Sequence, residues 1–480
     1  MKRALTRRSF VPAAAAPLFA QRAGRPRNLV FILSDDHRYD AMSCQGHPWI
    51  KTPHLDRLAQ GGVLFENAFV TTALCSPSRA SVLTGQYVHS HGVLDNVTAL
   101  RSDLPTFPQL LQQQGYKTAL IGKWHMGGDS DDPRPGFDQW VSFRGQGLYN
   151  DPVLNINGKR DKSPGYVSDL LTNHAVDFVR ANATSPFMLY LSHKAVHADF
   201  FPADRHKNLY SSEPIPYPKT YANTDENYRG KPEWVRRQRQ SWHGVDGMYN
   251  QRVNFEQFYR DYARTLAGLD DSIGGVMDEL KRLNLLEDTL VIYMGDNGFM
   301  FGEHGLIDKR TMYESSIRVP MIAHCPAMFS GGRRVSGMAL NIDICPTMLE
   351  AAGAAKPATV HGRSLLPLMR GEGQWRTEFL YEYFWERDYP QTPTVIGLRT
   401  DKYSYMHYHG VWDIDELYDI RRDPEQSNNL LAGYRIRNEG GRLLNRITDA
   451  EMRKRVVDFQ QRINRILAET GGRIDPRWKA

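Results

Sequence analysis

A cysteine followed by a proline and an arginine opens the most chemically unusual stretch of the chain. Residues 73–85 read A-L-C-S-P-S-R-A-S-V-L-T-G, with a thiol at Cys75 and a guanidinium at Arg79. Ser76 and Pro77 favour a helix start, because a hydroxyl can cap the helix and the proline ring fixes φ. Cys75 is then expected at the positive end of that helix, where free N–H groups favour an anionic ligand. A buried packing cysteine is the alternative interpretation.

Oxygen-bearing side chains follow two apolar runs that are typical of strands buried on both faces. The runs are residues 28–34 and 289–294. A set of oxygen donors that includes no histidine and no thiolate suits a hard cation. We expect Ca²⁺, with Mg²⁺ as the alternative. For either pair alone, roles as turn residues or helix caps are the competing interpretation. The candidate metal ligands are Asp35, Asp36, Asp296 and Asn297.

Two lysines and two histidines are candidates for charge stabilisation and proton transfer. Lys123 and His125 flank Trp124, so in an extended backbone both side chains point the same way. His197 follows a strand candidate across a short loop, and Lys309 lies in a charged stretch. A solvated loop or surface position is the ordinary alternative for each of them.

Apolar runs alternating with helical patterns must position these side chains. Four β-runs separated by helices, each followed by polar residues, predict an α/β fold with a doubly wound, mostly parallel sheet flanked by helices. In such sheets ligands bind outside the carboxyl ends of the strands. Residues 127–165 are expected to be surface loops, and residues 198–254 a long ordered excursion that walls a pocket. The expected strands are 28–34, 116–121, 187–192 and 289–294, and the main expected helices are 52–58, 106–114, 167–179, 255–283 and 344–352.

A length of 480 residues predicts one large domain and a smaller one. We expect an export signal at residues 1–24, a catalytic domain at 25–372 and a C-terminal α+β subdomain at 373–480. Paired strands within 395–408, a turn at 409–410 and a final helix at 451–468 give that subdomain an antiparallel sheet. Four cysteines exclude a disulfide framework. A net charge of +6 is mild for this length and is consistent with an anionic substrate without identifying one, and we expect no nucleic-acid partner.

The N-terminus is basic and then apolar, with small residues near the end of the apolar segment. Arg7 and Arg8 followed by Ser9 and Phe10 resemble a twin-arginine export signal, with a disordered basic tail as the alternative. No later run of 18 apolar residues occurs, so no membrane span is expected after the leader. These features predict a periplasmic or secreted protein. They leave the oligomeric state and any disulfide open.

The full string C-x-P-x-R-x-x-x-x-T-G resembles the signature of type I sulfatases of the alkaline-phosphatase superfamily. The resemblance covers nearly the whole mature chain and implies that a maturase oxidises Cys75 to formylglycine. It also implies one calcium ion bound by the oxygen ligands named above together with residue 75. One departure is His197-Ala198-Asp199, where many members have His-x-Pro. The matching residues are Cys75, Pro77, Arg79, Thr84 and Gly85.

The family mechanism implies that one hydroxyl of the hydrated aldehyde attacks sulfur. Arg79, Lys123 and Lys309 would then offset the charge on the sulfate oxygens together with the metal. His197 would protonate the departing sugar oxygen, and His125 would act as the base that expels sulfate. No attacking water is needed.

Several later strings resemble bacterial N-acetylglucosamine-6-sulfatases, which implies a sulfated saccharide substrate, a 6-O-sulfate on N-acetylglucosamine or glucosamine. Trp242, His409 and Trp412 are the expected substrate-binding residues, with interdomain packing as the alternative for each. A phosphonate or phosphate diester hydrolase of the same superfamily remains open, as does a calcium-dependent glycan-binding protein with unmodified Cys75. An all-oxygen ligand set disfavours a two-zinc phosphatase. The strings are 202–207, 231–234, 241–246 and 392–413.

Overall fold

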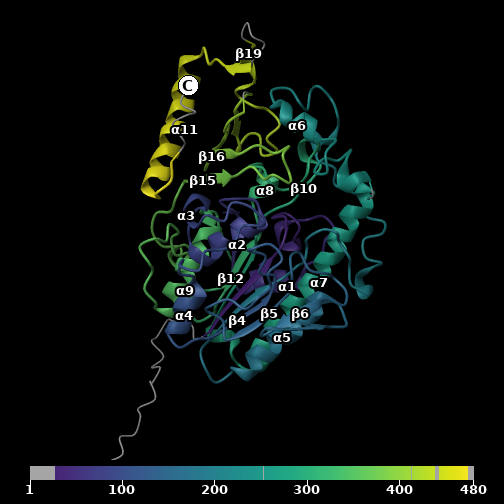
Figure 1. Cartoon of the computed structure of the whole chain (residues 1–480), viewed down its shortest axis with the longest axis vertical. Coiled ribbons are helices and arrows are strands. Elements are labelled where there is room, and N and C mark those ends of the chain that lie inside the picture. The colour runs from purple at the N-terminus through teal and green to yellow at the C-terminus, as the bar shows by residue number, and fades with distance from the viewer. Residues whose placement is uncertain (1–27, 252, 412, 438–442, 474–480) are drawn as a thin grey trace, which may run out of the picture.

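A ten-stranded mixed sheet lies at the centre of the computed structural model of the chain (Figure 1). The strand order is β13-β2-β12-β9-β1-β8-β4-β5-β6-β7. The four strands expected from the apolar runs are neighbours and run parallel, so their carboxyl ends lie along one edge of the sheet. These are β1 (Asn28–Ser34), β4 (Lys117–Gly122), β8 (Phe187–Ser192) and β9 (Thr289–Gly295). The structure describes residues 28–251, 253–411, 413–437 and 443–473.

Helices cover both faces of this sheet, which confirms the doubly wound α/β class. Along β1, Leu29, Phe31 and Leu33 belong to one buried apolar cluster, while Val30 and Ile32 belong to another on the opposite face. This alternation is why the whole strand reads as apolar. The first cluster includes side chains of α2 (Cys75–Thr84), α4 (Phe107–Gln113) and α9 (Ile344–Ala352); the second includes those of α1 (Pro53–Gln60), α5 (Val167–Ala181) and α7 (Phe255–Arg282).

Residues 127–165 are not all loop, so that expectation was wrong. Trp140 and Val141 are buried in β5, which pairs in parallel with β4. The two strands that follow form an antiparallel hairpin at the sheet edge, and one of them is exposed at every position. Such short strands in Gly- and Asp-rich sequence give no period-2 signal to recognise. They are β5 (Gln139–Ser142), β6 (Val153–Ile156) and β7 (Lys159–Lys162).

The other edge of the sheet makes it mixed rather than wholly parallel. β12 (Met321–His324) pairs antiparallel with both β9 and β2 (Val63–Phe65), and β13 (Arg333–Val335) closes that edge. Short elements connect the larger ones: α3 (Val88–His91), α6 (Glu233–Gln238), α8 (Glu314–Ile317), α10 (Leu366–Arg370), β3 (Ala68–Phe69), β10 (Met300–Phe301), β11 (Ile307–Asp308) and β14 (Ala339–Leu340).

A smaller antiparallel sheet follows the large one, as expected. The ring of Phe459 in α11 (Ala450–Glu469) stacks on Tyr405 with centroids 5.6 Å apart, which packs the last long helix against this sheet (Figure 1). The expected turn at 409–410 follows β17. The sheet contains β15 (Glu378–Tyr383), β16 (Val395–Thr400), β17 (Tyr403–Tyr408) and β18 (Glu416–Asp419), and a separate hairpin pairs β19 (Arg435–Arg437) with β20 (Leu443–Asn445).

The expected export signal at residues 1–24 lies outside the described residues. Among the helices that the structure describes, none has the length and apolar character needed to cross a bilayer.

Candidate active site

The ends of β1 and β9 bring together the four expected oxygen ligands. Carboxylate oxygens of Asp35, Asp36 and Asp296 lie within 4.8 Å of one another, and all four side chains are fully buried. Asn297 Nδ2 donates to Asp36 Oδ1 at 2.6 Å. Its Oδ1 is buried and has no hydrogen-bond partner among the described residues. An unpartnered amide oxygen beside three carboxylates is a donor set that a hard cation satisfies, so these residues fit calcium.

Burial and mutual charge give the three carboxyl groups different proton affinities. Burial alone would raise the pKa of Asp35, but Lys123, His197 and Arg79 outweigh it and hold that pKa well below the usual value. At Asp36, burial outweighs the attraction to Lys309 and raises the pKa to about 7. Burial and the neighbouring Asp35 also raise the pKa of Asp296. Three crowded carboxylates that resist full ionisation are typical of a site completed by a cation.

α2 begins at Cys75, with Leu74 as its N-cap, and not at the expected entry of Ser76 and Pro77. Cys75 therefore lies at the positive end of the helix, as expected, and it faces the carboxylate cluster. Its Sγ lies 3.5 Å from Asp35 Oδ1, and the residue is fully buried. Burial and the charge of Asp35 raise the pKa of the thiol. Since the thiolate is the reactive form of a cysteine, the unmodified side chain is a poor nucleophile here.

Arg79, one turn further along α2, is committed to the carboxylates. Its Nε and Nη2 donate to Asp296 Oδ2 at 3.0 and 2.8 Å, and its Nη1 donates to Ser192 Oγ at 2.6 Å. Nη2 also lies 3.5 Å from Asp35 Oδ2. Arg79 therefore neutralises two buried carboxylates and ties the end of β9 to the end of β8. Its expected role in offsetting charge on the sulfate oxygens stays a prediction.

Lys123 and His125 reach the cluster by a route that differs from the expected extended one. Lys123 follows β4, and its Nζ contacts Asp35 and Gln146 Oε1. His125 has a left-handed backbone with φ of 54°, so simple alternation around Trp124 does not hold. The His125 ring lies beside the residue that follows Cys75, with Nδ1 3.3 Å from Ser76 Oγ. Gln146 was not expected, since an isolated glutamine in a glycine-rich loop carries no pattern.

His197 and Lys309 both approach Asp36 from the side of the cavity. Lys309 Nζ donates to Asp36 Oδ2 at 2.8 Å and lies 3.2 Å from Asp308 Oδ1. His197 Nε2 lies 3.9 Å from the same Asp36 oxygen, and its Nδ1 is 2.5 Å from the Ala198 carbonyl. Burial and the charge of Lys309 lower the pKa of His197 well below its usual value. These two residues connect the buried cluster to open space.

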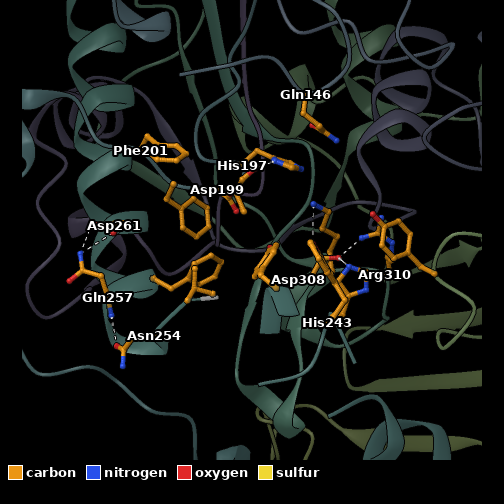
Figure 2. A pocket seen from close by; sticks show the side chains of 18 of the residues that line it. Gln146, His197, Asp199, Phe201, His243, Asn254, Gln257, Asp261, Asp308 and Arg310 are labelled. Atoms are coloured by element: carbon orange, nitrogen blue, oxygen red, sulfur yellow. Dashed lines mark hydrogen bonds and ion pairs between the residues drawn. The ribbon is translucent and has the colours of Figure 1, made fainter. Parts of the chain in front are cut away.

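A cavity of about 640 Å³ opens onto His197 and Lys309 (Figure 2). Trp242 lines it, as expected. His409 is not among its lining residues; it follows β17 at the turn, where its N–H donates to Thr394 O at 3.0 Å, so its expected role in substrate binding is not supported. Trp412 lies outside the described residues. Other residues of the excursion supply part of the wall, as expected for a segment that walls a pocket: Phe200, Phe201, His243, Tyr249, Val253 and Asn254.

One side of the cavity carries a charged and aromatic cluster that the sequence interpretation missed. Arg310 Nε donates to Glu386 Oε1 at 2.7 Å, and its guanidinium lies 4.0 Å from the ring centre of Tyr389. His243 Nε2 lies 3.3 Å from Asp308 Oδ2. The run of charged residues Asp308-Lys309-Arg310 was a signal that the sequence offered, but only Lys309 was singled out from it. Glu386 and Tyr389 come from the C-terminal region, and nothing local links them to this site.

Comparison with known proteins agrees with this geometry. The family model for sulfatases matches residues 27–354, and that for the C-terminal part of N-sulphoglucosamine sulphohydrolase matches residues 302–453. An N-acetylglucosamine-6-O-sulfatase of Bacteroides thetaiotaomicron is 33% identical over 470 aligned residues, covering 84% of this chain and 82% of the relative. Human N-acetylglucosamine-6-sulfatase is 29% identical and covers 86% and 82%.

Solved structures show the same fold. The structure of BT4656 in complex with its substrate D-glucosamine-2-N,6-O-disulfate has a TM-score of 0.81 and 30% identity, and covers 95% of this chain and all of that one. The two family models together match residues 27–453, from the first strand of the large sheet into the last helix. The chain belongs to the sulfatase family, as a type I sulfatase similar to bacterial N-acetylglucosamine-6-sulfatases.

Proposed function

We propose that this sulfuric ester hydrolase removes the 6-O-sulfate of an N-acetylglucosamine or glucosamine unit in a glycan. One observation carries the proposal. The cavity ends at His197 and Lys309, both of which approach Asp36, and Asp36 belongs to the buried cluster that includes Cys75. A sulfate group entering the cavity would therefore meet Lys309 and the His197 ring first, and the nucleophile position behind them.

Asp35, Asp36, Asp296 and Asn297 would hold the calcium ion, together with residue 75. Bound calcium would supply positive charge that stabilises the sulfate oxygens in the transition state. The chain prepares this site in two ways. Arg79 fixes Asp296 through two hydrogen bonds, and Asn297 keeps its amide oxygen turned away from protein donors while its Nδ2 holds Asp36.

Residue 75 is proposed to act after oxidation to formylglycine, whose hydrated aldehyde would supply the attacking hydroxyl. The buried position of Cys75 and the raised pKa of its thiol support this proposal, because an unmodified thiol here stays protonated. The His125 ring lies beside Ser76, and Ser76 belongs to the first turn of α2, which also carries residue 75. Burial and the charge of Lys123 lower the pKa of His125 well below its usual value, so the ring is neutral and able to accept a proton.

Lys123 and Lys309 would stabilise the charge on the sulfate oxygens. Each is buried and pairs with a carboxylate of the cluster, Lys123 with Asp35 and Lys309 with Asp36. With calcium held by the carboxylates, Lys123 and Lys309 would be less tightly paired with them and would supply charge to the incoming anion. Fixed charges in a dry site stabilise a transition state more than mobile charges in water do.

His197 would protonate the departing sugar oxygen. Its Nδ1 is close enough to the Ala198 carbonyl to donate to it, which turns Nε2 toward Asp36 and the cavity. In the free protein the pKa of His197 is lowered by burial and by Lys309. A sulfate ester brings negative charge to this place, which favours the protonated ring and supplies the acid when it is needed.

Two measurements test the proposal. Peptide mass spectrometry of matured protein should show residue 75 as an aldehyde, and active protein with an intact thiol would overturn the formylglycine mechanism. A panel of 2-, 3-, 4- and 6-sulfated sugars should show preference for the 6-sulfate. Phosphonate and phosphate diesters belong in the same panel, because PehA of Trinickia caryophylli, a multifunctional alkaline phosphatase superfamily protein, is 27% identical over 84% of this chain. Faster turnover of a diester would replace the sulfatase assignment.

We also propose export by the twin-arginine route to the periplasm or the medium, with a catalytic domain at 25–372 and a C-terminal subdomain at 373–480. The names of two relatives, extracellular sulfatase homologues of Caenorhabditis elegans and Drosophila melanogaster, support export. Fractionation of cells that make the wild-type chain or the Arg7→Lys, Arg8→Lys double variant tests the route. Retention of only the variant in the cytoplasm is expected, and equal export of both would exclude the twin-arginine pathway.

A further inference from the structure

The cavity extends away from the charged cluster toward the start of α7. We call this part the outer arm and define it by Phe201, Trp242, Asn254, Gln257 and Asp261. Cavities of about 300–1,000 Å³ enclose most of a drug-sized ligand, so a volume of about 640 Å³ leaves room beyond one sulfated sugar. Figure 2 shows Phe201, Asn254, Gln257 and Asp261 gathered on one side of the cavity and His243, Asp308 and Arg310 on the other.

The outer arm presents aromatic faces and amides to the cavity. Phe201 is 53% exposed and Trp242 is 41% exposed, which is high for side chains of this size. Trp242 is held in place by Tyr249, with ring centres 5.1 Å apart. Asn254 Oδ1 caps α7 by accepting from Gln257 N at 3.1 Å, and Gln257 Nε2 donates to both carboxylate oxygens of Asp261 at 2.9 Å. Rigid rings with fixed amides suit the C–H face and the hydroxyls of a sugar.

The charge of the outer arm is opposite to that of the sulfate end. Among the described residues that line the outer arm, none is a lysine or an arginine, whereas Lys309 and Arg310 line the other side. Asp261 contributes a carboxylate, partly offset by Arg264 Nη1 at 3.0 Å, and Asp199 lies on the path between the two sides. A sugar that carries a carboxylate or a second sulfate would lie next to these acidic groups. No lysine or arginine lining the outer arm would offset its negative charge, so it would bind with lower affinity.

We propose that the outer arm is a second sugar subsite that binds an uncharged saccharide unit joined to the sulfated glucosamine. The inference rests on the proposed function and deepens it, because it assigns the substrate to glycans in which a neutral hexose, and not a uronic acid, neighbours the 6-sulfated unit. Phe201 and Trp242 supply the stacking surface for this unit. Gln257 and Asn254 supply hydrogen bonds to its hydroxyls.

Steady-state kinetics with matured enzyme test this subsite. The substrates are 6-sulfated N-acetylglucosamine and its disaccharides with a neutral hexose or a uronic acid, each attached at the anomeric carbon or at the 4-oxygen. For the wild type we expect at least one neutral disaccharide to exceed the monosaccharide in kcat/KM by roughly tenfold, and both uronic acid disaccharides to fall below it. Equal values for all five substrates, or preference for a uronic acid, would overturn the subsite.

Variants separate the subsite from general damage. Phe201→Ala should reduce the ratio of disaccharide to monosaccharide kcat/KM by about fivefold or more. Trp385→Ala, a matched change at an aromatic residue that is 51% exposed and does not line the cavity, should leave the ratio unchanged. Gln257→Lys should raise kcat/KM for a uronic acid disaccharide, because it adds a cation to the outer arm. An unchanged ratio in Phe201→Ala refutes the subsite alone, while wild-type enzyme without activity on any of the five 6-sulfated substrates refutes the proposed function as well.

Discussion

The two ends of the cavity are built in opposite ways. The sulfate end lies at the carboxyl ends of four adjacent parallel strands and at the start of α2, and its side chains are buried and joined by charged hydrogen bonds. The outer arm comes from the excursion after β8 and the start of α7, and its side chains are exposed except for the half-buried Asp261. The rigid sheet therefore fixes the chemistry, whereas a segment outside the sheet selects the sugar. Changes at the sulfate end should act on kcat, and changes in the outer arm on KM.

Cys75→Ala should give the largest effect. Removing the residue that becomes the nucleophile is expected to lower kcat by at least about 10⁴-fold. Circular dichroism should show an intact fold, because the substitution removes one buried sulfur. Cys345→Ala, at a buried cysteine of α9 remote from the carboxylates, is the matched control and should keep full activity. Comparable loss in both variants would mean that the effect is structural.

Calcium removal should act on activity and stability together. Chelation followed by thermal unfolding should lower Tm, and calcium should restore it. The metal-free folded state holds a proton on Asp36 up to about pH 7, whereas the unfolded chain releases it near its ordinary pKa of about 4. Metal-free protein therefore loses stability as pH rises through that window. Calcium needs the ionised carboxylate, so its effect on Tm should grow from about pH 5.5 to about pH 8.

Two variants locate the calcium effect. Asn297→Leu removes the unpartnered amide oxygen and should abolish the rise in Tm on adding calcium. Asp270→Asn changes a buried carboxyl group that accepts from the backbone of His54 and Leu55 instead, and it should leave that rise intact. A calcium response that survives in Asn297→Leu would place the ion elsewhere.

The contrast between the sulfate end, built on the sheet, and the outer arm, built on an irregular segment, explains what the sequence could predict. Apolar runs identified all four central strands, and the polar residues after each strand identified the site, because parallel strands deliver their carboxyl ends to one edge. The placement of Cys75 at the positive end of α2 was also correct. These features are local in sequence and repeat the same physical pattern. The clustering of the carboxylates at this edge of the sheet was therefore predictable from local patterns, whereas the two lysines and two histidines of the site were chosen from the resemblance to sulfatases.

The partners made by tertiary contacts were not predictable in this way. Arg79 bonds to Asp296, which is 217 residues away, and Arg310 bonds to Glu386, which is 76 residues away. Neither pairing has a local signature. His409 was chosen from a string resemblance alone, and the turn that carries it does not line the cavity. The outer arm depends on how an irregular segment packs, which periodicity does not encode.

His197→Gln tests the boundary between the two ends. We expect kcat on a sugar sulfate to fall by roughly 10²–10³-fold, because the departing alkoxide loses its acid. On a nitrophenyl sulfate, whose leaving group needs little protonation, the fall should be about tenfold or less. His174→Gln, on α5, is the control and should behave as wild type on both substrates. Equal losses on the two substrates would show that His197 positions the sulfate and does not move a proton.

Trp242→Ala should give the smallest effect and the clearest contrast with Cys75→Ala. The indole is partly exposed at the cavity edge and touches none of the buried charged groups by hydrogen bond or ion pair among the described residues. Its loss should raise KM for a disaccharide by about three- to tenfold with kcat unchanged, because the indole is expected to stabilise the bound substrate and the transition state equally. A fall in kcat with constant KM would mean that the outer arm contributes to the transition state, and the division between rigid chemistry and variable recognition would then fail at this residue.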